Sequence, residues 1–130
     1  MATEGFDGFY IETRNYGATA AFWISLGFES VFETDHGSGQ FRHSTGGPYI
    51  FINERHEGDL ETHPILKVGD ATTFDPDRDP DWVQRFEPTH WNTVEAVVRD
   101  PDGREVSLQA PVPAGESAVD TDAHHTEKYG

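Results

Sequence analysis

The chain contains no cysteine, which excludes disulfide bonds, thiolate metal ligands and a cysteine nucleophile. It also has no run that approaches the roughly 18 apolar residues that a membrane-spanning helix needs. The first residues show no basic segment that leads into an apolar run, so we expect no secretory signal. Together these absences predict a cytoplasmic protein without a membrane partner.

Positive charge is scarce. Nine Lys and Arg face 24 Asp and Glu, the formal net charge is −15, and the only lysines are Lys67 and Lys128. Such a surface repels phosphate backbones, so we expect no nucleic-acid partner. The simplest explanation of the acidic excess is solubility, and the alternative is an acidic patch that attracts a cationic ligand.

Large apolar side chains are present in quantity. Nine Phe, four Tyr and three Trp in 130 residues are sufficient for the core of one domain, which we place at residues 1–110. Residues 111–130 are rich in Pro, Ala, Gly, Ser and acids and predict a disordered tail. The pair His124-His125 in this tail is more easily explained as incidental than as a metal-ligand pair.

The first half of the chain predicts strand, helix, strand, strand, strand. Apolar and polar residues alternate from 9 to 13, as in a half-buried strand. Asn15 can cap a helix with apolar residues at three- and four-residue spacing, and Gly27 suits the left-handed end of that helix. Three further strands are expected at 28–34, 40–44 and 49–53, with turns at Asp35-His36-Gly37-Ser38-Gly39 and Gly46-Gly47. These elements form a module at about residues 8–54.

A similar order recurs in a second module at about residues 63–110. Strands are expected at 64–68, 95–99 and 105–109, and Asp100-Pro101-Asp102-Gly103 between the last two predicts a hairpin turn. The second helix should lie between residues 70 and 81, but two prolines and five Asp there disfavour a long one. We expect at most one helical turn, at 82–86.

Two motifs resemble the vicinal-oxygen-chelate superfamily, which includes glyoxalase I, bleomycin-resistance proteins and extradiol dioxygenases. Ala-Phe-Trp at 21–23 with Leu-Gly-Phe at 26–28 resembles its helix-to-strand junction, and the turn at 100–103 resembles its last hairpin. The resemblance covers residues 8–110 and is closest to the bleomycin-resistance-like branch. It implies an α+β fold of two βαβββ modules that form a curved mixed sheet cup, the second with a shortened or missing helix.

The resemblance also bears on metal binding. Many metal-using members place one ligand on the first strand and one on the last strand of each module. In this sequence the matching positions are Gly8, Phe51, His63 and Ser107, of which His63 alone is a usual ligand. Because a divalent metal needs about three protein ligands, we expect no metal and no cofactor.

One alternative is a divalent metal held by a rearranged set. Glu12, His43 and His63 could converge in the same cup, with Glu12 as a general base of raised pKa. More often such a residue is simply paired with a cation, and Arg14 or Lys67 could serve here.

Strand alternation predicts which side chains line the cup. Phe9, Ile11, Leu66 and Val68 are expected to face the helix side instead. Aromatic residues with sparse polar groups are typical of organic-ligand pockets, although aromatic side chains also pack on sheet faces without any ligand. Trp91, at a position where bleomycin-resistance-like members often carry Trp, either stacks on a planar ligand or closes the core. The predicted ligand-binding set is Tyr10, Glu12, His43, Tyr49, Phe51, Asn53, His63, Lys67, Trp91 and Ser107.

Three functions remain open. The leading hypothesis is a metal-free, homodimeric protein that sequesters or senses a small organic ligand, an aromatic compound that can also be cationic. The alternative is a metal-dependent lyase, isomerase or dioxygenase of the same superfamily, so the sequence leaves enzymatic activity undecided. A third is an accessory module that acts through partner proteins, which predicts a filled cavity and an exposed apolar patch.

Overall fold

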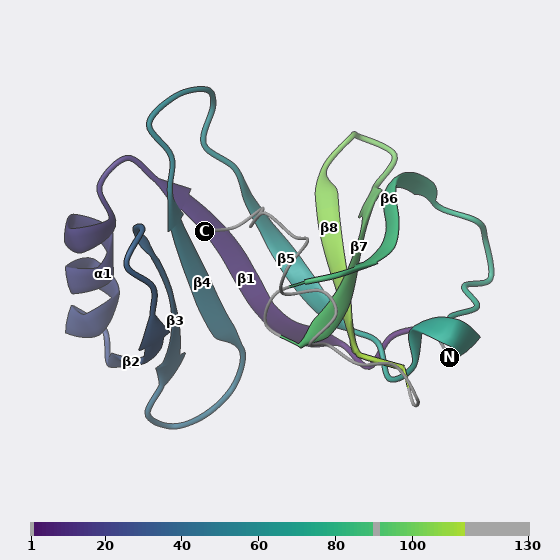
Figure 1. Ribbon diagram of the computed structural model, residues 1–130, viewed down its shortest axis with the longest axis horizontal. Coiled ribbons are helices and arrows are strands. Elements are labelled where there is room, and N and C mark those ends of the chain that lie inside the picture. Colours follow the sequence, from purple (N-terminus) through teal and green to yellow (C-terminus); the bar gives the residue numbers. More distant parts are fainter. Residues whose placement is uncertain (1, 90–91, 114–130) are drawn as a thin grey trace. The chain divides into compact units, whose positions relative to one another are not determined.

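A computed structural model describes residues 2–89 and 92–113 (Figure 1). The chain divides into two compact units. The first unit is Asp7–His63, and the second unit combines residues 2–6 with those from Pro64 onward. Among the described residues, no helix has the length and apolar character needed to cross a membrane. Trp91, His124-His125 and most of the predicted tail lie outside the described residues.

The first unit has the predicted strand and helix order. Its elements are β1 (Phe6–Thr13), α1 (Tyr16–Ser25), β2 (Phe28–Glu33), β3 (Ser38–His43) and β4 (Tyr49–Glu54). The strands lie in the order β2-β3-β4-β1, with β1 parallel to β4 and the other pairs antiparallel. This mixed arrangement with one helix confirms the α+β class.

Both ends of α1 follow from local chemistry. The Asn15 side chain accepts a hydrogen bond from the Ala18 amide at 3.0 Å, which caps the first turn. Gly27 follows the helix with φ +101°, a conformation that is strained for other residues. A Cβ atom at Gly27 would also lie 2.6 Å from His43 Nε2, so space and backbone both require glycine.

The core of the first unit lies between α1 and the sheet. Phe41 and Ile52 are completely buried there, and Phe9 and Ile11 pack against them, as the alternation predicted. This face of the sheet therefore serves packing, and polar side chains of β1 and β4 point to the opposite face.

The second unit replaces the helix with a single 3₁₀ turn. Its elements are β5 (Thr62–Lys67), η1 (Ala71–Thr73), β6 (Asp81–Pro88), β7 (Thr93–Arg99) and β8 (Glu105–Pro111). The strands follow the order β5-β8-β7-β6, with β5 parallel to β8. The predicted shortened helix is therefore present as η1.

The predicted helical turn at 82–86 is wrong, because these residues belong to strand β6. Trp82 pairs with Val98 of β7 in an antiparallel ladder. Trp82, Gln84 and Phe86 are half-buried and the residues between them exposed, which is the two-residue period of a strand.

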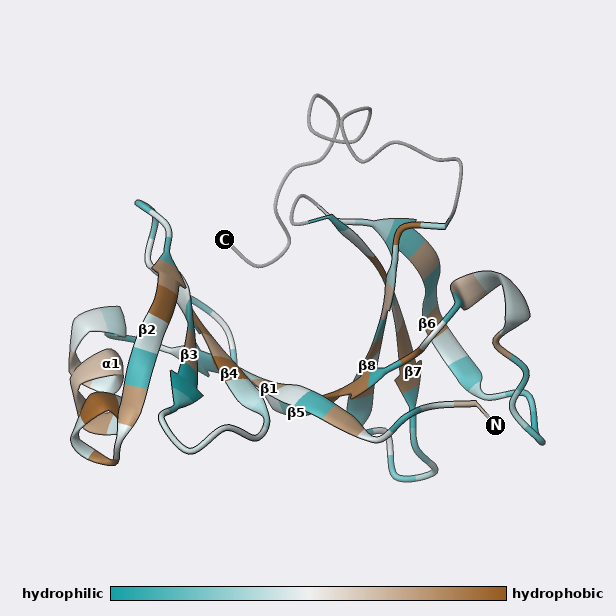
Figure 2. Cartoon of the chain, turned by 90° about the horizontal axis from the view of Figure 1, so that it is seen from below, coloured by the Kyte–Doolittle hydropathy of each residue, from teal (hydrophilic) through white to brown (hydrophobic). Residues whose placement is uncertain are grey.

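Aromatic side chains cover the core of the second unit in place of a helix. The ring of Phe74, just after η1, lies 6.0 Å from that of Trp82 and 5.6 Å from that of Phe86, both in T-shaped contacts. These rings pack on a core that includes Val68 and Leu108. The 70–81 segment thus covers the apolar face of its own sheet. Figure 2 shows hydrophobic residues gathered in the strands and hydrophilic ones in most connecting loops.

Candidate functional site

A buried polar cluster lies on the sheet face of the first unit that points away from α1. The Tyr10 hydroxyl donates to Glu12 Oε2 at 2.7 Å, and Asn53 Nδ2 donates to the Tyr10 oxygen at 3.1 Å. The parallel register of β1 and β4, which sets Glu12 beside Asn53, brings them together. Each of the three residues is less than 10% exposed, at 3%, 8% and 6% respectively. Buried polar groups with mutual hydrogen bonds hold a fixed geometry.

The carboxylate of Glu12 is fully engaged. Oε1 accepts the Glu61 amide at 2.9 Å, and Arg55 Nη1 lies 3.4 Å from both oxygens. With the Tyr10 bond, each oxygen accepts two hydrogen bonds. These contacts tie the linker that follows β4 to β1, so the geometry favours an anchoring role for Glu12 over the predicted general base.

A row of rings borders this polar cluster. Tyr10 stacks with Phe51 at a centroid distance of 6.4 Å and an interplanar angle of 19°. His63 lies 4.9 Å from Tyr10 on one side, and Phe32 lies 6.2 Å from Phe51 on the other. Phe32 is 41% exposed, so the row ends at solvent. The other three rings are buried, so Phe32 is the ring of this row that a planar ligand could contact first.

Phe32 was absent from the predicted set because of a β-bulge in β2. Simple alternation puts Phe28, Ser30 and Phe32 on one face, and Phe28 does pack against the helix-side core. The register with β3 shifts between Ser30 and Phe32, so Phe32 pairs with Gln40 and reaches the opposite face. No sequence signal marks this bulge.

His63 is buried, with 5% of its surface exposed. Burial lowers the pKa of the imidazole, while the negative charges of Glu61 and Glu12 act in the opposite direction to a smaller extent. The ring is therefore mainly neutral near pH 7.

The structure places His43 on the helix side of the sheet, opposite to the face that carries Tyr10, Glu12 and Phe51. It shares the helix side of β3 with Phe41, and its ring lies 5.2 Å from that of Phe28. Its Nδ1 accepts from the Thr45 amide at 3.1 Å. The alternative metal set of Glu12, His43 and His63 therefore does not converge, and the prediction that His43 joins the cup is wrong.

The four positions that match family metal ligands do not suit a metal. Phe51 of β4 and Ser107 of β8 occupy matching places beside the parallel strands β1 and β5. Neither Gly8 nor Phe51 has a donor atom, and a serine hydroxyl is a poor substitute for His or a carboxylate. His63 is the one usual ligand among them.

Tyr49 leaves no space for a side chain at position 8, which explains why this position is glycine. A Cβ atom at Gly8 would lie 2.6 Å from the Tyr49 carbonyl oxygen and 2.7 Å from its ring. Tyr49 is 7% exposed, and Arg42 lies 5.6 Å above its ring centre. The space that a first-strand ligand would need is thus occupied by tyrosine.

The remaining predicted residues belong to the second unit. Ser107 is completely buried, while Lys67 is largely exposed and lies 4.0 Å from a carboxylate oxygen of Glu4. Gln109, two residues beyond Ser107, donates to the buried Glu95 at 3.4 Å. Glu95 was not predicted, because a carboxylate inside an apolar strand gives no signal of its burial.

Comparisons with known proteins identify the fold. No family model and no curated protein matches the sequence. A glyoxalase/bleomycin resistance/dioxygenase superfamily member from Vibrio splendidus 12B01 is similar in structure, with a TM-score of 0.61, 15% identity, and coverage of 79% of this chain and 96% of that one. A structure described as NAD-dependent benzaldehyde dehydrogenase from Legionella pneumophila has a TM-score of 0.55, 15% identity, and coverage of 80% and 97%. The chain thus has the fold of the glyoxalase/bleomycin resistance/dioxygenase superfamily, which confirms the resemblance at the level of fold.

Proposed function

We propose that this chain is a small-molecule binding protein of the bleomycin-resistance-like type, which sequesters or senses an aromatic compound without a metal. The observation that carries the proposal is the row of rings from His63 through Tyr10 and Phe51 to Phe32, set beside the hydrogen-bonded Glu12. Aromatic walls with a few fixed polar groups are the general composition of organic-ligand sites.

The energetics favour a planar ligand. Each aromatic pair contributes about 0.5–1.5 kcal/mol beyond the area that it buries. Tyr10 and Asn53 are already fixed by hydrogen bonds, so a ligand need not order them. The entropic cost of binding is reduced accordingly.

Charge favours a cationic form of that ligand. The net charge of −15 attracts cations from solution. An aromatic cation combines this attraction with cation–π contact to a ring such as that of Phe32.

A homodimer and a cytoplasmic location belong to the same proposal. Exposed apolar residues on α1 and β2, among them Phe22 at 56% and Val31 at 53%, are consistent with self-association. Light scattering coupled to size exclusion at several protein concentrations tests the dimer.

Calorimetric titration with N-methylquinolinium, a planar cation, tests the binding function, with neutral N-methylquinolone as the matched ligand. We expect saturable binding that prefers the cation and weakens about tenfold or more in Phe51→Leu, which retains apolar volume but loses the ring. Phe86→Leu, in the second unit, is the control and should bind like the parent.

Elemental analysis of protein dialysed against trace divalent metals completes this test. We expect no metal above background. Near-stoichiometric metal that disappears in His63→Ala would contradict the proposal and favour a metal-dependent lyase, isomerase or dioxygenase. Equal quinolinium affinity in Phe51→Leu and the parent would remove the row of rings as the site.

A further inference from the structure

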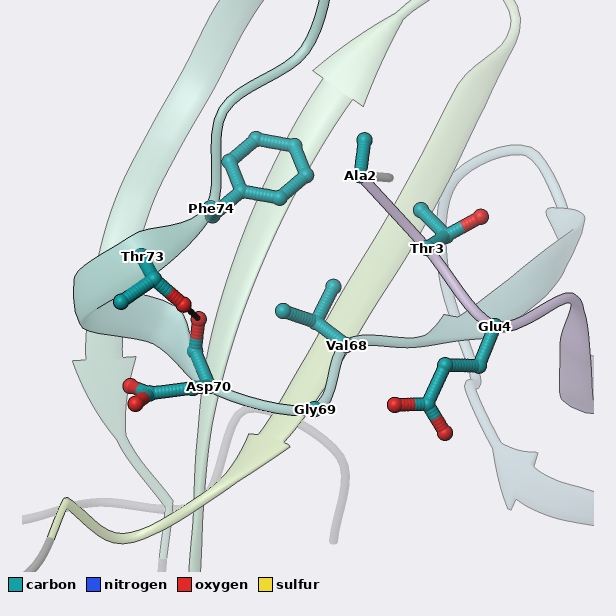
Figure 3. A pocket seen from close by; sticks show the side chains of 8 residues that line it. All are labelled: Ala2, Thr3, Glu4, Val68, Gly69, Asp70, Thr73 and Phe74. Carbon is teal, nitrogen blue, oxygen red and sulfur yellow. Dashed lines mark hydrogen bonds between the residues drawn. The ribbon is translucent and has the colours of Figure 1, made fainter.

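The two units differ in where polar groups meet apolar surface. The second unit has a pocket of about 260 Å³ with Val68 and Phe74 on its apolar side (Figure 3). The carboxylate of Asp70 points out of this pocket and away from that of Glu4, and Asp70 Oδ1 accepts from the Thr72 amide at 2.9 Å. The lining residues are Ala2, Thr3, Glu4, Val68, Gly69, Asp70, Thr73 and Phe74. The carboxylates of this lining set therefore do not converge on one ligand group.

The first unit, in contrast, places an amide group within its row of rings. Gln40 of β3 pairs with Phe32 of β2 on one side and with Phe51 of β4 on the other. Residues that pair across neighbouring strands direct their side chains to the same face of the sheet. Tyr10 of β1 pairs in turn with Phe51. The line across these four strands thus contains three rings and one amide, which stands between Phe51 and Phe32.

The side chain of Gln40 is half-buried at this place. The strands β2 and β4 are two strand spacings apart, or about 9.6 Å. The ring centroids of Phe32 and Phe51 are only 6.2 Å apart, so the rings lean toward each other over β3. Within the described part of the chain, the amide of Gln40 forms no side-chain hydrogen bond. A polar group that can bind a ligand therefore lies directly beside the exposed ring of Phe32.

The hairpin of β2 and β3 fixes the backbone around Gln40. The β-bulge in β2 turns Phe32 toward the face of Gln40. A Cβ atom at the neighbouring Gly39 would lie 2.9 Å from the Phe32 carbonyl oxygen, so this close approach of the two strands requires glycine. At the end of the hairpin, the Thr34 amide donates to the Ser38 carbonyl at 2.9 Å. A ligand therefore meets a backbone that is already ordered, which lowers the entropic cost of binding.

We infer that Gln40 recognises the edge of a planar ligand, and that this ligand is a heteroaromatic cyclic amide with a ring N–H beside a carbonyl. The inference rests on the proposed aromatic site and specifies its ligand class. A glutamine side chain presents a carbonyl acceptor and an NH₂ donor side by side, and a cyclic amide presents the matching donor and acceptor. Phe32, which is 41% exposed, supplies the stacking surface for the same ligand. A few polar groups of this kind fix the orientation of a ligand on apolar walls.

Calorimetric titration of the full chain with 2-quinolone and N-methyl-2-quinolone tests the inference, because the second ligand carries a methyl group in place of the ring N–H. We expect 2-quinolone to bind about tenfold more tightly, because methylation removes one hydrogen bond and leaves the half-buried carbonyl of Gln40 without a donor. In Gln40→Met, which keeps the length of the side chain but removes the amide, the two quinolones should bind equally.

Three controls isolate the amide of Gln40. N-methylquinolinium has neither an N–H group nor a carbonyl, so Gln40→Met should bind it like the parent. Phe51→Leu should weaken both quinolones equally and keep the tenfold preference, because it changes a ring and not the amide. Gln84→Met, at a half-buried position of β6 in the second unit, should also keep the preference.

The possible failures of the two proposals are distinct. Equal affinity of the parent for both quinolones, or a preference that persists in Gln40→Met, would overturn the role of Gln40 while N-methylquinolinium still binds at the aromatic site. Absence of saturable N-methylquinolinium binding to the parent would overturn the aromatic site itself, and the role of Gln40 with it.

Discussion

The two units share one strand layout and differ in what covers it. In each, the first strand pairs in parallel with the last, and a buried apolar face lies on one side of the sheet. The first unit covers this face with the ten residues of α1, the second with η1 and the rings around Phe74. The same strand layout can thus bury its apolar face either beneath a helix or beneath a short turn and aromatic side chains.

The opposite faces differ in chemistry. Glu12 and Asn53 are register neighbours in the first unit, and Lys67 and Gln109 occupy the matching places in the second. The first pair joins a buried hydrogen-bonded network, whereas Lys67 is mostly exposed. The two units therefore differ in the chemistry of this face, and the first unit carries the row of rings.

The largest expected effect on stability concerns the residues at the covered apolar faces of the two sheets. Phe41 is completely buried beneath α1, so Phe41→Ala should lower the free energy of unfolding by about 3–5 kcal/mol. Phe74 is only half-buried, so Phe74→Ala should cost about 1–2 kcal/mol. Urea denaturation of both variants measures the difference. Equal losses would show that the loop cover is as tightly packed as the helix.

The polar faces give the next largest difference. Glu12→Ala leaves the Tyr10 hydroxyl and the Glu61 amide without their acceptor, and we expect a loss of about 2–3 kcal/mol in unfolding free energy. Lys67→Ala, at the matching exposed position, should stay within about 0.5 kcal/mol of the parent. Glu12→Gln should recover part of the loss, because one acceptor oxygen remains. An unchanged free energy of unfolding in Glu12→Ala would refute the anchoring role.

The smallest expected effect is a pH dependence from His63. Burial holds its pKa in the folded chain below the usual value of about 6.5, so the unfolded chain takes up the proton first on acidification. Its contribution to stability is therefore complete above about pH 6.5 and is lost as the pH falls toward the folded pKa.

Thermal unfolding between pH 5 and 7.5, roughly the range in which histidine titrates, measures this effect. His63→Leu should lose less stability on acidification than the parent does. His56→Gln is the control, because the His56 side chain is 79% exposed. If the stability of the parent and of His63→Leu changed equally with pH, the predicted contribution of His63 would be excluded.

Much of the backbone could be predicted because its signals are local. The cap at Asn15, the left-handed Gly27 and the hairpin at Gly103 each act over a few residues. The strand β6 was not predicted, although Trp82, Gln84 and Phe86 follow its two-residue period, because Pro76 and Pro80 before it are equally typical of an interrupted helix. Alternation placed Phe9 and Ile11 on the helix side correctly.

The candidate site was less predictable. Alternation gave Tyr10 and Phe51 a shared face, but it could not show that Glu12 binds the amide of Glu61, 49 residues away. It missed Phe32, because the bulge in β2 shifts the register by one residue and so reverses the face of the side chain. The expectation that His43 converges with Glu12 and His63 did not come from alternation, and the register of β3 with β4 places His43 on the face of Phe41.

By itself, the sequence determined the order of the elements in the first unit, the loss of a long second helix, and the presence of one usual metal ligand, His63, among the four positions that match those of the family. These depend on residue types and short spacings. The tertiary structure alone decided that Glu12 anchors a linker, that a bulge turns Phe32 toward the rings and that a pocket lies beside Gly69. Each of these depends on hydrogen bonds and contacts between distant parts of the chain, which only folding brings within reach.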